Sequence, residues 1–567
     1  MKRCLHTVML YLLSAGTMTS CTKKVDFAYD NRVNPQADAA SSVRIVNLRG
    51  ATELMIGGKQ LSAFVLPNAE GYYDQNTTKG TPFFPETGRM GLTYTIPQQF
   101  VGAAGTVKDI RFASFARNFA LALTRGFVAK DDFSHPVDYY FTYFAPNAGQ
   151  LTDSLFAIPR SVSPPANPER CKVRLLNLSS ANMPFGGDMR VTWADGTAIA
   201  GLENVGAGKY SDYVELPYGT YQLKVMTMNG QMVPGVGGSI QYLNVINPQT
   251  GTMMLPGVKA KPRVNGFVDS KLTFAPLKTY QPGGVYTIVV ADQPNFQYPT
   301  GSDNGETYPA KNNAFRIIAD AEPQNNTYAR LQAVNVLPGN SIKVMIDGNM
   351  LGNTLAFSAA SVFKPVITGT HVLKVTDAAG ATLADSMISL LPGDNSTIWI
   401  YEKAGKAAIS VVPNNLSNSF YTGATEDGSY SLAKIEFPSW IRFMNFCADA
   451  PEVTFTTDDG QMLGNGVASQ RLQLGIPLVK NPYAMLDANF YNSVLAYASK
   501  QEVVPGNWLR QVTPLRSRDF IAQPELYPAG QSPLSEAGVY TVALIGRLNT
   551  SKPGSEKARM IIIKHNQ

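Results

Sequence analysis

Short runs of alternating apolar and polar residues recur along this chain, and turn-forming residues separate them. Alternation over a few residues is typical of a β-strand with one buried face. Four of these runs share one pattern, an apolar strand that ends in asparagine, at residues 43–47, 173–177, 331–335 and 441–445. A second alternating run follows each of them and ends in a glycine turn, at residues 54–58, 191–196, 344–348 and 453–460. Asp-Gly and Gly-Gly between such runs predict tight hairpins, because these turns need positive φ angles.

Two further segments recur and complete a repeat. Residues 216–225 match residues 367–375. A late apolar strand appears at residues 284–290, 396–401 and 538–544, with a counterpart at 139–144. Repeats of this length, roughly 110 to 160 residues, are too long for a solenoid and suit tandem β-sandwich domains.

We therefore divide the chain into six segments. They are a signal peptide at 1–20, a flexible tether at 21–41 and four sandwich repeats at 42–165, 166–315, 316–430 and 431–567. Residues 62–110 and 462–535 are long for sandwich loops, so we expect them to be insertions that carry partner contacts.

The repeat resembles a known domain family. An opening R-x-x-N strand, an Asp-Gly hairpin, the P-x-G-x-Y-x-L-x-V pattern of residues 217–225 and a closing Gly-x-Tyr-Thr strand look like an immunoglobulin-like domain of unknown function. That domain occurs in tandem on secreted bacterial proteins. The resemblance implies an all-β fold of tandem immunoglobulin-like β-sandwiches with long insertions and little helix, outside the cytoplasm. It implies no activity and no catalytic residues.

Composition agrees with short strands joined by turns. The chain has 48 glycines, 37 prolines, 26 tyrosines and 27 phenylalanines, and only 16% of its residues are charged, against about 25% in average soluble proteins. The formal charge of +6 is spread over 567 residues without a Lys/Arg run. We therefore expect no nucleic-acid partner.

The first residues have the order of a secretory signal. Lys2 and Arg3 precede an apolar run at 8–13, small and polar residues fill 14–20, and Cys21 follows. The apolar run is too short to cross a bilayer, which needs about 20 residues. The segment resembles the lipobox of bacterial lipoproteins, in the looser form found in the Bacteroidota.

That resemblance implies that Cys21 is lipidated and anchors the chain in the outer membrane, since several acyl chains make a stable anchor. The alternative is an ordinary secretory signal with a chance cysteine. Lys23 and Lys24 stand where surface-exported lipoproteins often carry acidic residues. The sequence leaves the cell-surface and periplasmic faces both open.

The recurring asparagine, at Asn47, Asn177, Asn335 and Asn445, invites a functional reading. Side chains alternate between the two faces of a strand, so each asparagine lies at the end of the apolar face. We expect a structural role there, in which the amide satisfies loop backbone groups. The arginines of the motif lie on the other face, where we expect bridges to a neighbouring strand or domain. Cys171 and Cys447 are predicted to be lone buried thiols, with a disulfide between them as the alternative.

Aromatic residues are the best candidates for ligand binding. Tyr72, Tyr73, Trp440 and Trp508 could stack on sugar rings, although aromatics are also ordinary strand residues. The sequence carries no signature of a catalytic nucleophile, a metalloprotease or a phosphate-binding loop. We predict no catalytic residue, no metal site and no cofactor.

The leading hypothesis is a lipid-anchored, non-catalytic scaffold or adhesion module that docks other outer-membrane or surface proteins. One alternative is a surface glycan-binding lipoprotein that assists a nutrient transporter. The other is a polysaccharide-active enzyme, because a pair of carboxylates can be assembled by the fold from distant residues.

Replacement of Cys21 by serine tests the anchor. Serine cannot form the thioether that carries the lipid, so Cys21→Ser should leave the domains folded and move the protein from the membrane fraction to the soluble fraction. Cell fractionation with immunoblotting measures this. Recovery of the variant in the membrane fraction would contradict lipid anchoring through Cys21.

Overall fold

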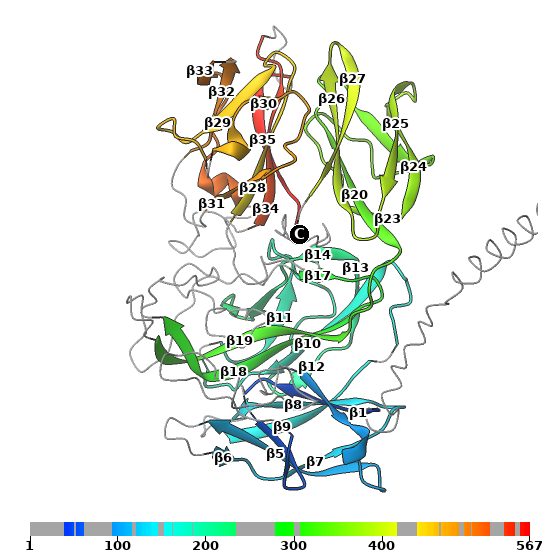
Figure 1. Ribbon diagram of the computed structural model, residues 1–567, viewed down its shortest axis with the longest axis vertical. Helices are drawn as coiled ribbons and strands as arrows, with labels where there is room; N and C mark the ends of the chain where they lie inside the picture. Colours follow the sequence, from blue (N-terminus) through cyan, green and yellow to red (C-terminus); the bar gives the residue numbers. More distant parts are fainter. Residues whose placement is uncertain are drawn as a thin grey trace, which may run out of the picture. The chain divides into compact units, whose positions relative to one another are not determined.

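The structure is a computed structural model, and its regular elements are β-strands joined by turns. It describes residues 39–49, 51, 53–61, 93–115, 121–145, 152–161, 163–183, 185–233, 278–299, 307–414, 416, 439–463, 466–486, 493–500, 502–521, 538–549 and 556–566. The predicted all-β fold of tandem sandwiches is confirmed (Figure 1). Within the described ranges, no helix has the length and apolar character needed to cross a membrane.

The chain divides into two compact units, which are described separately. One holds most of the first repeat, and the other holds the second, third and fourth repeats. Every repeat uses one plan. Its opening strand lies between an edge strand and the late strand of one sheet, and the last strand of the repeat pairs with the other side of the late strand. These sheets have the orders β4-β1-β8-β9, β12-β10-β18-β19, β23-β20-β26-β27 and β31-β28-β34-β35.

A second sheet covers the other side of each core. The orders are β3-β2-β5-β6 with β7 beside β5, then β11-β15-β16, β22-β21-β24-β25 and β30-β29-β32-β33. In the second repeat, β13 also pairs with β10, and β14 pairs with β17.

The described residues of the first repeat form nine strands and one 3₁₀ turn. They are β1 (Ala40–Asn47), β2 (Glu53–Ile56), β3 (Lys59–Gln60), β4 (Thr93–Pro97), η1 (Gln98–Phe100), β5 (Thr106–Phe115), β6 (Leu121–Leu123), β7 (Phe127–Lys130), β8 (Val137–Phe144) and β9 (Thr152–Pro159). The expectation of a loop insertion at 62–110 is wrong for its second part, because β4 pairs with β1 and β5 pairs with β2. Residues 62–92 lie outside the described residues.

The second repeat begins at β10. Its strands are β10 (Arg170–Leu178), β11 (Met189–Thr192), β12 (Lys209–Tyr210), β13 (Val214–Pro217), β14 (Gly219–Tyr221), β15 (Lys224–Thr227), β16 (Met232–Val233), β17 (Lys278–Tyr280), β18 (Val285–Pro299) and β19 (Thr307–Ala321). The third repeat comprises β20 (Tyr328–Asn335), β21 (Ile342–Ile346), β22 (Asn349–Met350), β23 (Lys364–Ile367), β24 (Gly369–Asp377), β25 (Thr382–Leu390), β26 (Asn395–Lys403) and β27 (Lys406–Pro413).

The fourth repeat follows the plan of the third. It comprises β28 (Ser439–Cys447), β29 (Glu452–Thr456), η4 (Val467–Ser469), β30 (Leu472–Gln473), β31 (Tyr483–Leu486), β32 (Leu495–Lys500), β33 (Val503–Trp508), η5 (Ser517–Phe520), β34 (Gly538–Gly546) and β35 (Arg559–Lys564). Four of these strands, β30 to β33, lie within 462–535, so this segment is also not a loop insertion as a whole. Their short runs carry too little alternation to be recognised from the sequence.

The recurring sequence motifs are paired strands. The opening strand runs parallel to the late strand, with Asn177 opposite Val290, Asn335 opposite Ile400 and Asn445 opposite Leu544. The predicted hairpin at 344–348 is the β21–β22 turn, where Asp347 and Gly348 have φ angles of 47° and 81°. Glycine adopts this region at little cost, which explains its recurrence at the turn.

Each recurring asparagine lies at the end of its opening strand and binds loop backbone. The Asn335 Nδ2 atom donates to the carbonyl oxygens of Asn340 at 2.8 Å and Leu355 at 2.9 Å, and its Oδ1 atom accepts from the Leu337 N–H at 3.0 Å. Asn177 and Asn445 repeat this arrangement of two carbonyls and one N–H. The side chain therefore closes the loop that connects the two sheets.

The arginines of the motif lie on the opposite face and bridge to other strands. Arg44 donates from Nε to Asp138 at 2.9 Å, and Arg174 donates to the Thr287 hydroxyl at 2.9 Å. Arg442 instead donates to Asn414 Oδ1 at 3.3 Å, at the end of the third repeat. In the first and second repeats, the arginine of the motif thus bonds within its own repeat. In the fourth repeat, it joins neighbouring repeats.

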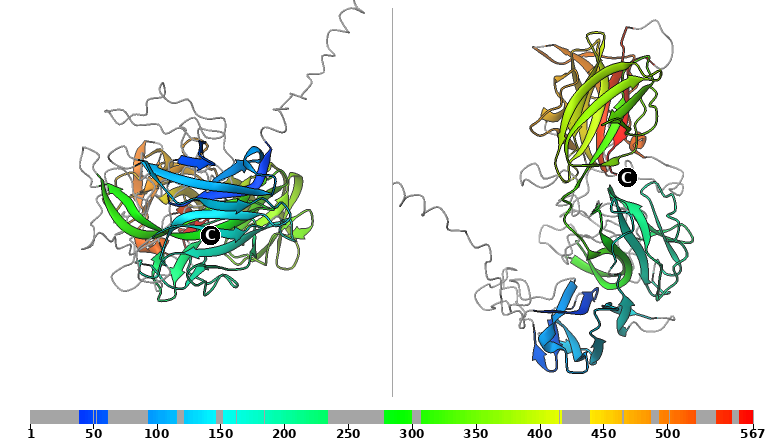
Figure 2. Two further views of the ribbon diagram at one scale, coloured as in Figure 1. Left: turned by 90° about the horizontal axis from the view of Figure 1, so that it is seen from below. Right: turned by 90° about the vertical axis from the view of Figure 1, so that its right-hand side faces the viewer.

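An apolar cluster joins the third and fourth repeats. In β26, Ile398 and Ile400 face the core of their own sandwich, whereas Trp399 points out of it and is fully buried. Phe446 on β28 stacks on Trp399 with 4.7 Å between the ring centroids. Figure 2 shows the two sandwiches from further directions. The sheets that contain the opening strands are therefore apolar on both faces.

The two remaining cysteines are free and buried in different cores. Cys171 belongs to the core of the second repeat and Cys447 to that of the fourth. Burial raises the pKa of the Cys171 thiol to about 12 and that of Cys447 to about 11. Both thiols stay protonated at neutral pH and act as small apolar side chains.

A buried carboxyl group lies beside the opening strand of the second repeat. Asp292 on β18 is fully buried and accepts hydrogen bonds from the Ser179 hydroxyl at 3.2 Å and the Ser180 N–H at 3.0 Å. Burial raises the pKa of Asp292 to about 6, although these hydrogen bonds oppose the rise. The carboxyl group is therefore more easily protonated in the folded protein than in the unfolded chain, where its pKa is about 3.9.

Replacement of Asn335 by alanine should destabilise the third repeat. The change removes three hydrogen bonds, those to the Asn340 and Leu355 carbonyl oxygens and that from the Leu337 N–H, at about 1 kcal/mol for each lost bond, or about 3 kcal/mol in all. Guanidinium unfolding and hydrogen exchange of β20 measure the loss. Asn349→Ala, on the exposed strand β22, is the matched control and should be nearly neutral. A loss as small as that of the control would contradict the loop-closing role.

Replacement of Asp292 by asparagine should change the pH dependence of stability. Because the folded pKa is raised, the stabilisation that Asp292 contributes is complete below about pH 4 and is lost as the pH rises through about 6. Asp292→Asn should thus become more stable than the parent above pH 6, by up to about 3 kcal/mol for two pKa units. Unfolding at pH 4 to 8 measures this, with the exposed Asp385→Asn as control. An unchanged pH profile in Asp292→Asn would refute the prediction.

Candidate functional site

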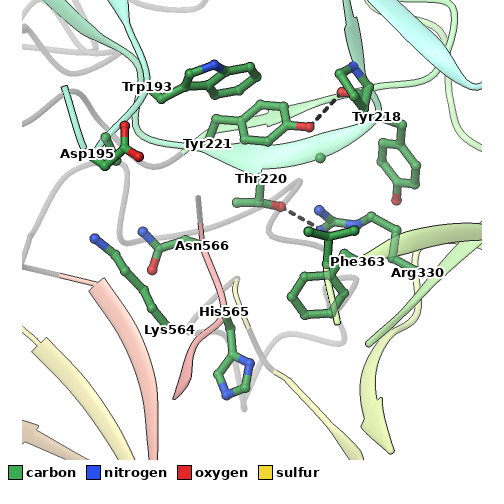
Figure 3. Close-up of a pocket in the computed structure, with 14 residues that line it drawn as sticks. Trp193, Asp195, Tyr218, Thr220, Tyr221, Arg330, Phe363, Lys564, His565 and Asn566 are labelled. Atoms are coloured by element: carbon green, nitrogen blue, oxygen red, sulfur yellow. Dashed lines mark hydrogen bonds between the residues drawn. The ribbon is translucent and has the colours of Figure 1, made fainter. Parts of the chain in front are cut away.

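A pocket lies where the second, third and fourth repeats come together, all within one compact unit (Figure 3). Its volume is about 540 Å³, which is in the range of small-molecule sites. The side chains around it that carry rings, charges or amides are Trp193, Asp195, Tyr218, Thr220, Tyr221, Arg330, Phe363, Lys564, His565 and Asn566.

One wall of the pocket is aromatic and comes from the second repeat. Trp193 follows β11 in the hairpin, and its ring lies edge-on to Tyr221 of β14 at 5.0 Å between centroids. The Tyr221 hydroxyl donates to the Pro217 carbonyl at 2.9 Å, which holds the ring in place. Tyr221 is buried, whereas Trp193 is only partly buried at the edge of the core. The indole therefore remains accessible from the pocket (Figure 3).

Arg330 holds the second and third repeats together at the pocket. It is the third residue of β20 and is 2% exposed. Its guanidinium donates to the Thr220 hydroxyl at 2.7 Å and lies 4.8 Å from the centroid of the Tyr218 ring. Phe363, from the loop before β23, lies 5.8 Å from the same guanidinium. An arginine over aromatic rings is attracted by their π-electrons.

The segment after β35 forms the facing wall. Asn566 donates from Nδ2 to Gln222 Oε1 of the second repeat, and its Oδ1 accepts from the Val539 N–H at 2.7 Å. His565 lies between the hydroxyls of Thr541 at 2.7 Å and Thr397 at 3.5 Å. Burial, together with Arg442, lowers the pKa of His565 well below its usual value, so its ring is neutral at neutral pH.

The charged groups make the pocket modestly electropositive. Arg330 and Lys564 are cations, Asp195 is the one acidic side chain in the lining, and His565 is neutral. Asp195 is partly exposed and accepts a hydrogen bond from the Thr197 N–H at 2.8 Å. In Figure 3, Lys564 and Asn566 lie across the pocket from Trp193. The lining thus offers an aromatic surface, hydrogen-bond donors and an acceptor to one ligand.

The structure does not gather the aromatic candidates that the sequence suggested. Cys21, Tyr72 and Tyr73 lie outside the described residues. Trp440 is partly buried on β28, while Trp508 is 46% exposed at the end of β33 in the other sheet of the same sandwich. These two tryptophans belong to different sheets and to neither wall of the pocket.

Trp193 was missed by sequence reasoning, although it lies in a segment that was recognised. Residues 191–196 were interpreted only as a hairpin, and Tyr221 only as part of the P-x-G-x-Y pattern. Neither motif indicates that the two rings meet, since β11 and β14 are in different sheets. The third and fourth repeats supply the rest of the site, and no sequence signal links them to it.

The other two described histidines, His371 and His135, lie outside the pocket lining. His371 on β24 contacts Asp347 and the Ile367 carbonyl, both at 2.7 Å. His135 is exposed in a turn beside Asp132. No three His, Cys, Asp or Glu side chains among the described residues lie close enough to hold a metal ion.

Comparison with known proteins gives distant structural matches. No family model matches this sequence, and no curated protein matches it. A candidate cell adhesion protein from Bacteroides ovatus is 10% identical, with a TM-score of 0.12, over 42% of this chain and 96% of that protein. Another candidate cell adhesion protein, from Bacteroides fragilis, is 11% identical, with a TM-score of 0.13, over 66% and 97%.

The major pilin subunit of Bacillus cereus is also similar at this level. It is 11% identical, with a TM-score of 0.10, over 60% of this chain and 91% of that protein. Matches this distant assign neither a family nor a function to this chain.

Proposed function

We propose that the protein is a lipid-anchored, non-catalytic adhesion or scaffold protein of the cell envelope. Cys21 would anchor it in the outer membrane, and the sandwiches would present a binding surface to another outer-membrane or surface protein. The observation that carries this proposal is the apolar cluster between the third and fourth repeats, with Trp399 stacked on Phe446.

This cluster packs the two sandwiches against each other within one compact unit. A binding surface that spans two repeats then loses little conformational freedom when a partner docks, which favours affinity. Arg330 and Asn566 also connect these sandwiches to the second repeat through hydrogen bonds to Thr220 and Gln222. The three repeats therefore act as one preformed platform.

Glycan capture is a second candidate function, and the pocket favours it. Trp193 and Tyr221 supply an aromatic wall, and Asp195, Lys564 and Arg330 supply charged groups around one pocket. Sugar rings stack on aromatic side chains through their C–H faces and use hydroxyl groups for hydrogen bonds.

Crosslinking in living cells tests the adhesion proposal. A photo-crosslinking residue at exposed Met387, which pairs with exposed Val372 across β24 and β25, should capture one envelope protein in a reproducible ratio. The same residue at exposed Lys406, the first residue of β27, serves as the control position. Mass spectrometry identifies the product.

Release of the protein from the membrane should reduce this capture, because anchoring keeps both proteins at one surface. Cys21→Ser should therefore lower the yield of the crosslinked product severalfold. Recovery of no defined product from several exposed positions would remove the support for a docking function.

A further inference from the structure

We infer that the pocket between the second, third and fourth repeats binds a saccharide that carries a carboxylate group. This inference rests on glycan capture, the second candidate function, and names the class of sugar. The feature that distinguishes the class is the pairing of an aromatic wall with two cations in one pocket.

The aromatic wall selects for a ring with an apolar face. Trp193 is partly buried, and its indole meets the Tyr221 ring edge-on at 5.0 Å between centroids, while the Tyr221 ring lies tilted against that of Tyr280 at 5.9 Å. These ring contacts restrict the orientation of the indole. A preorganised ring gives up little entropy when a pyranose stacks on it.

The two cations of the lining select for negative charge. Lys564 and Arg330 carry the two positive charges of the lining, and the neutral state of His565 adds none. The ammonium group of the partly exposed Lys564 lies 5.7 Å from the centroid of the Tyr540 ring, and the Arg330 guanidinium donates to the Thr220 hydroxyl. Hydrogen bonds to charged groups contribute more than neutral ones. The two cations of the lining therefore favour acidic sugars over neutral sugars.

Asp195 distinguishes a saccharide from an acidic peptide. A carboxylate in the lining repels a polyanionic peptide, but it accepts hydrogen bonds from the hydroxyl groups of a sugar. The pocket volume of about 540 Å³ suits a short oligosaccharide rather than an extended strand. Hydroxyl recognition by Asp195 and carboxylate recognition by Lys564 are compatible within one acidic sugar.

An array of matched sugars tests the inference on the full mature chain. Each acidic member stands beside a neutral partner of the same shape, such as oligogalacturonate with its methyl ester and sialyllactose with lactose, and poly-glutamate peptides are included. We expect at least one acidic sugar to bind about tenfold more tightly than its neutral partner. Raising the salt concentration should weaken binding of the acidic sugar, because charge attraction is screened.

Three variants and two controls assign the binding to this pocket. Trp193→Ala should abolish binding of every sugar, and Trp193→Phe should retain part of it if the alanine variant is unstable. Lys564→Gln should weaken the acidic sugar about tenfold and leave the neutral partner unchanged. Lys406→Gln and Trp508→Ala, at exposed positions outside the pocket, should bind as the parent does.

The outcomes distinguish failure of the acidic preference from failure of glycan capture. Equal binding of acidic and neutral sugars would overturn the acidic preference and leave glycan capture standing. Binding of no sugar, or tighter binding of the peptides, would overturn both. An effect of Trp508→Ala without an effect of Trp193→Ala would place the sugar elsewhere and would also overturn the inference.

Discussion

The burial of both faces of a β-sheet is the constraint on which the second compact unit depends. In β26 and β28, one set of alternate side chains fills the core of its own sandwich, and the other set meets the neighbouring repeat. Trp399 and Phe446 stack in that second layer at 4.7 Å. Burial of large aromatic side chains contributes several kcal/mol, so the third and fourth repeats are held as one body.

Polar side chains complete the same layer where the apolar ones end. His565 lies between hydroxyls of the third and fourth repeats, and Arg442 reaches Asn414. Buried polar groups need partners, because water cannot reach them. These contacts align the segment after β35 so that Lys564 and Asn566 face the second repeat. The position of the pocket wall is thus a consequence of how two sandwiches pack.

The pocket also depends on a difference between repeats that share one plan. His371 in the third repeat occupies the position equivalent to Tyr221 in the second. His371 contacts Asp347, whereas Tyr221 contacts a tryptophan. Only the second of these two repeats therefore presents an aromatic wall. Tandem copies keep the loop-closing asparagine, while the residues at the sandwich ends are free to differ. A shared fold can carry a binding site at one junction only.

The sequence by itself determined the local features of this protein. Alternation predicted the strands, Asp-Gly predicted the β21–β22 hairpin, and the recurring motifs located the opening and late strands that pair in parallel. These features depend on neighbours within a few residues or on a repeat that the chain displays openly. The strands β4 and β30 to β33, all but β32 at the edge of a sheet, were missed, because short strands are stabilised by their partners more than by their own pattern. Only the tertiary structure decided that Trp193, Arg330 and Lys564 line one pocket, since their contacts join residues from three repeats and leave no local pattern to read.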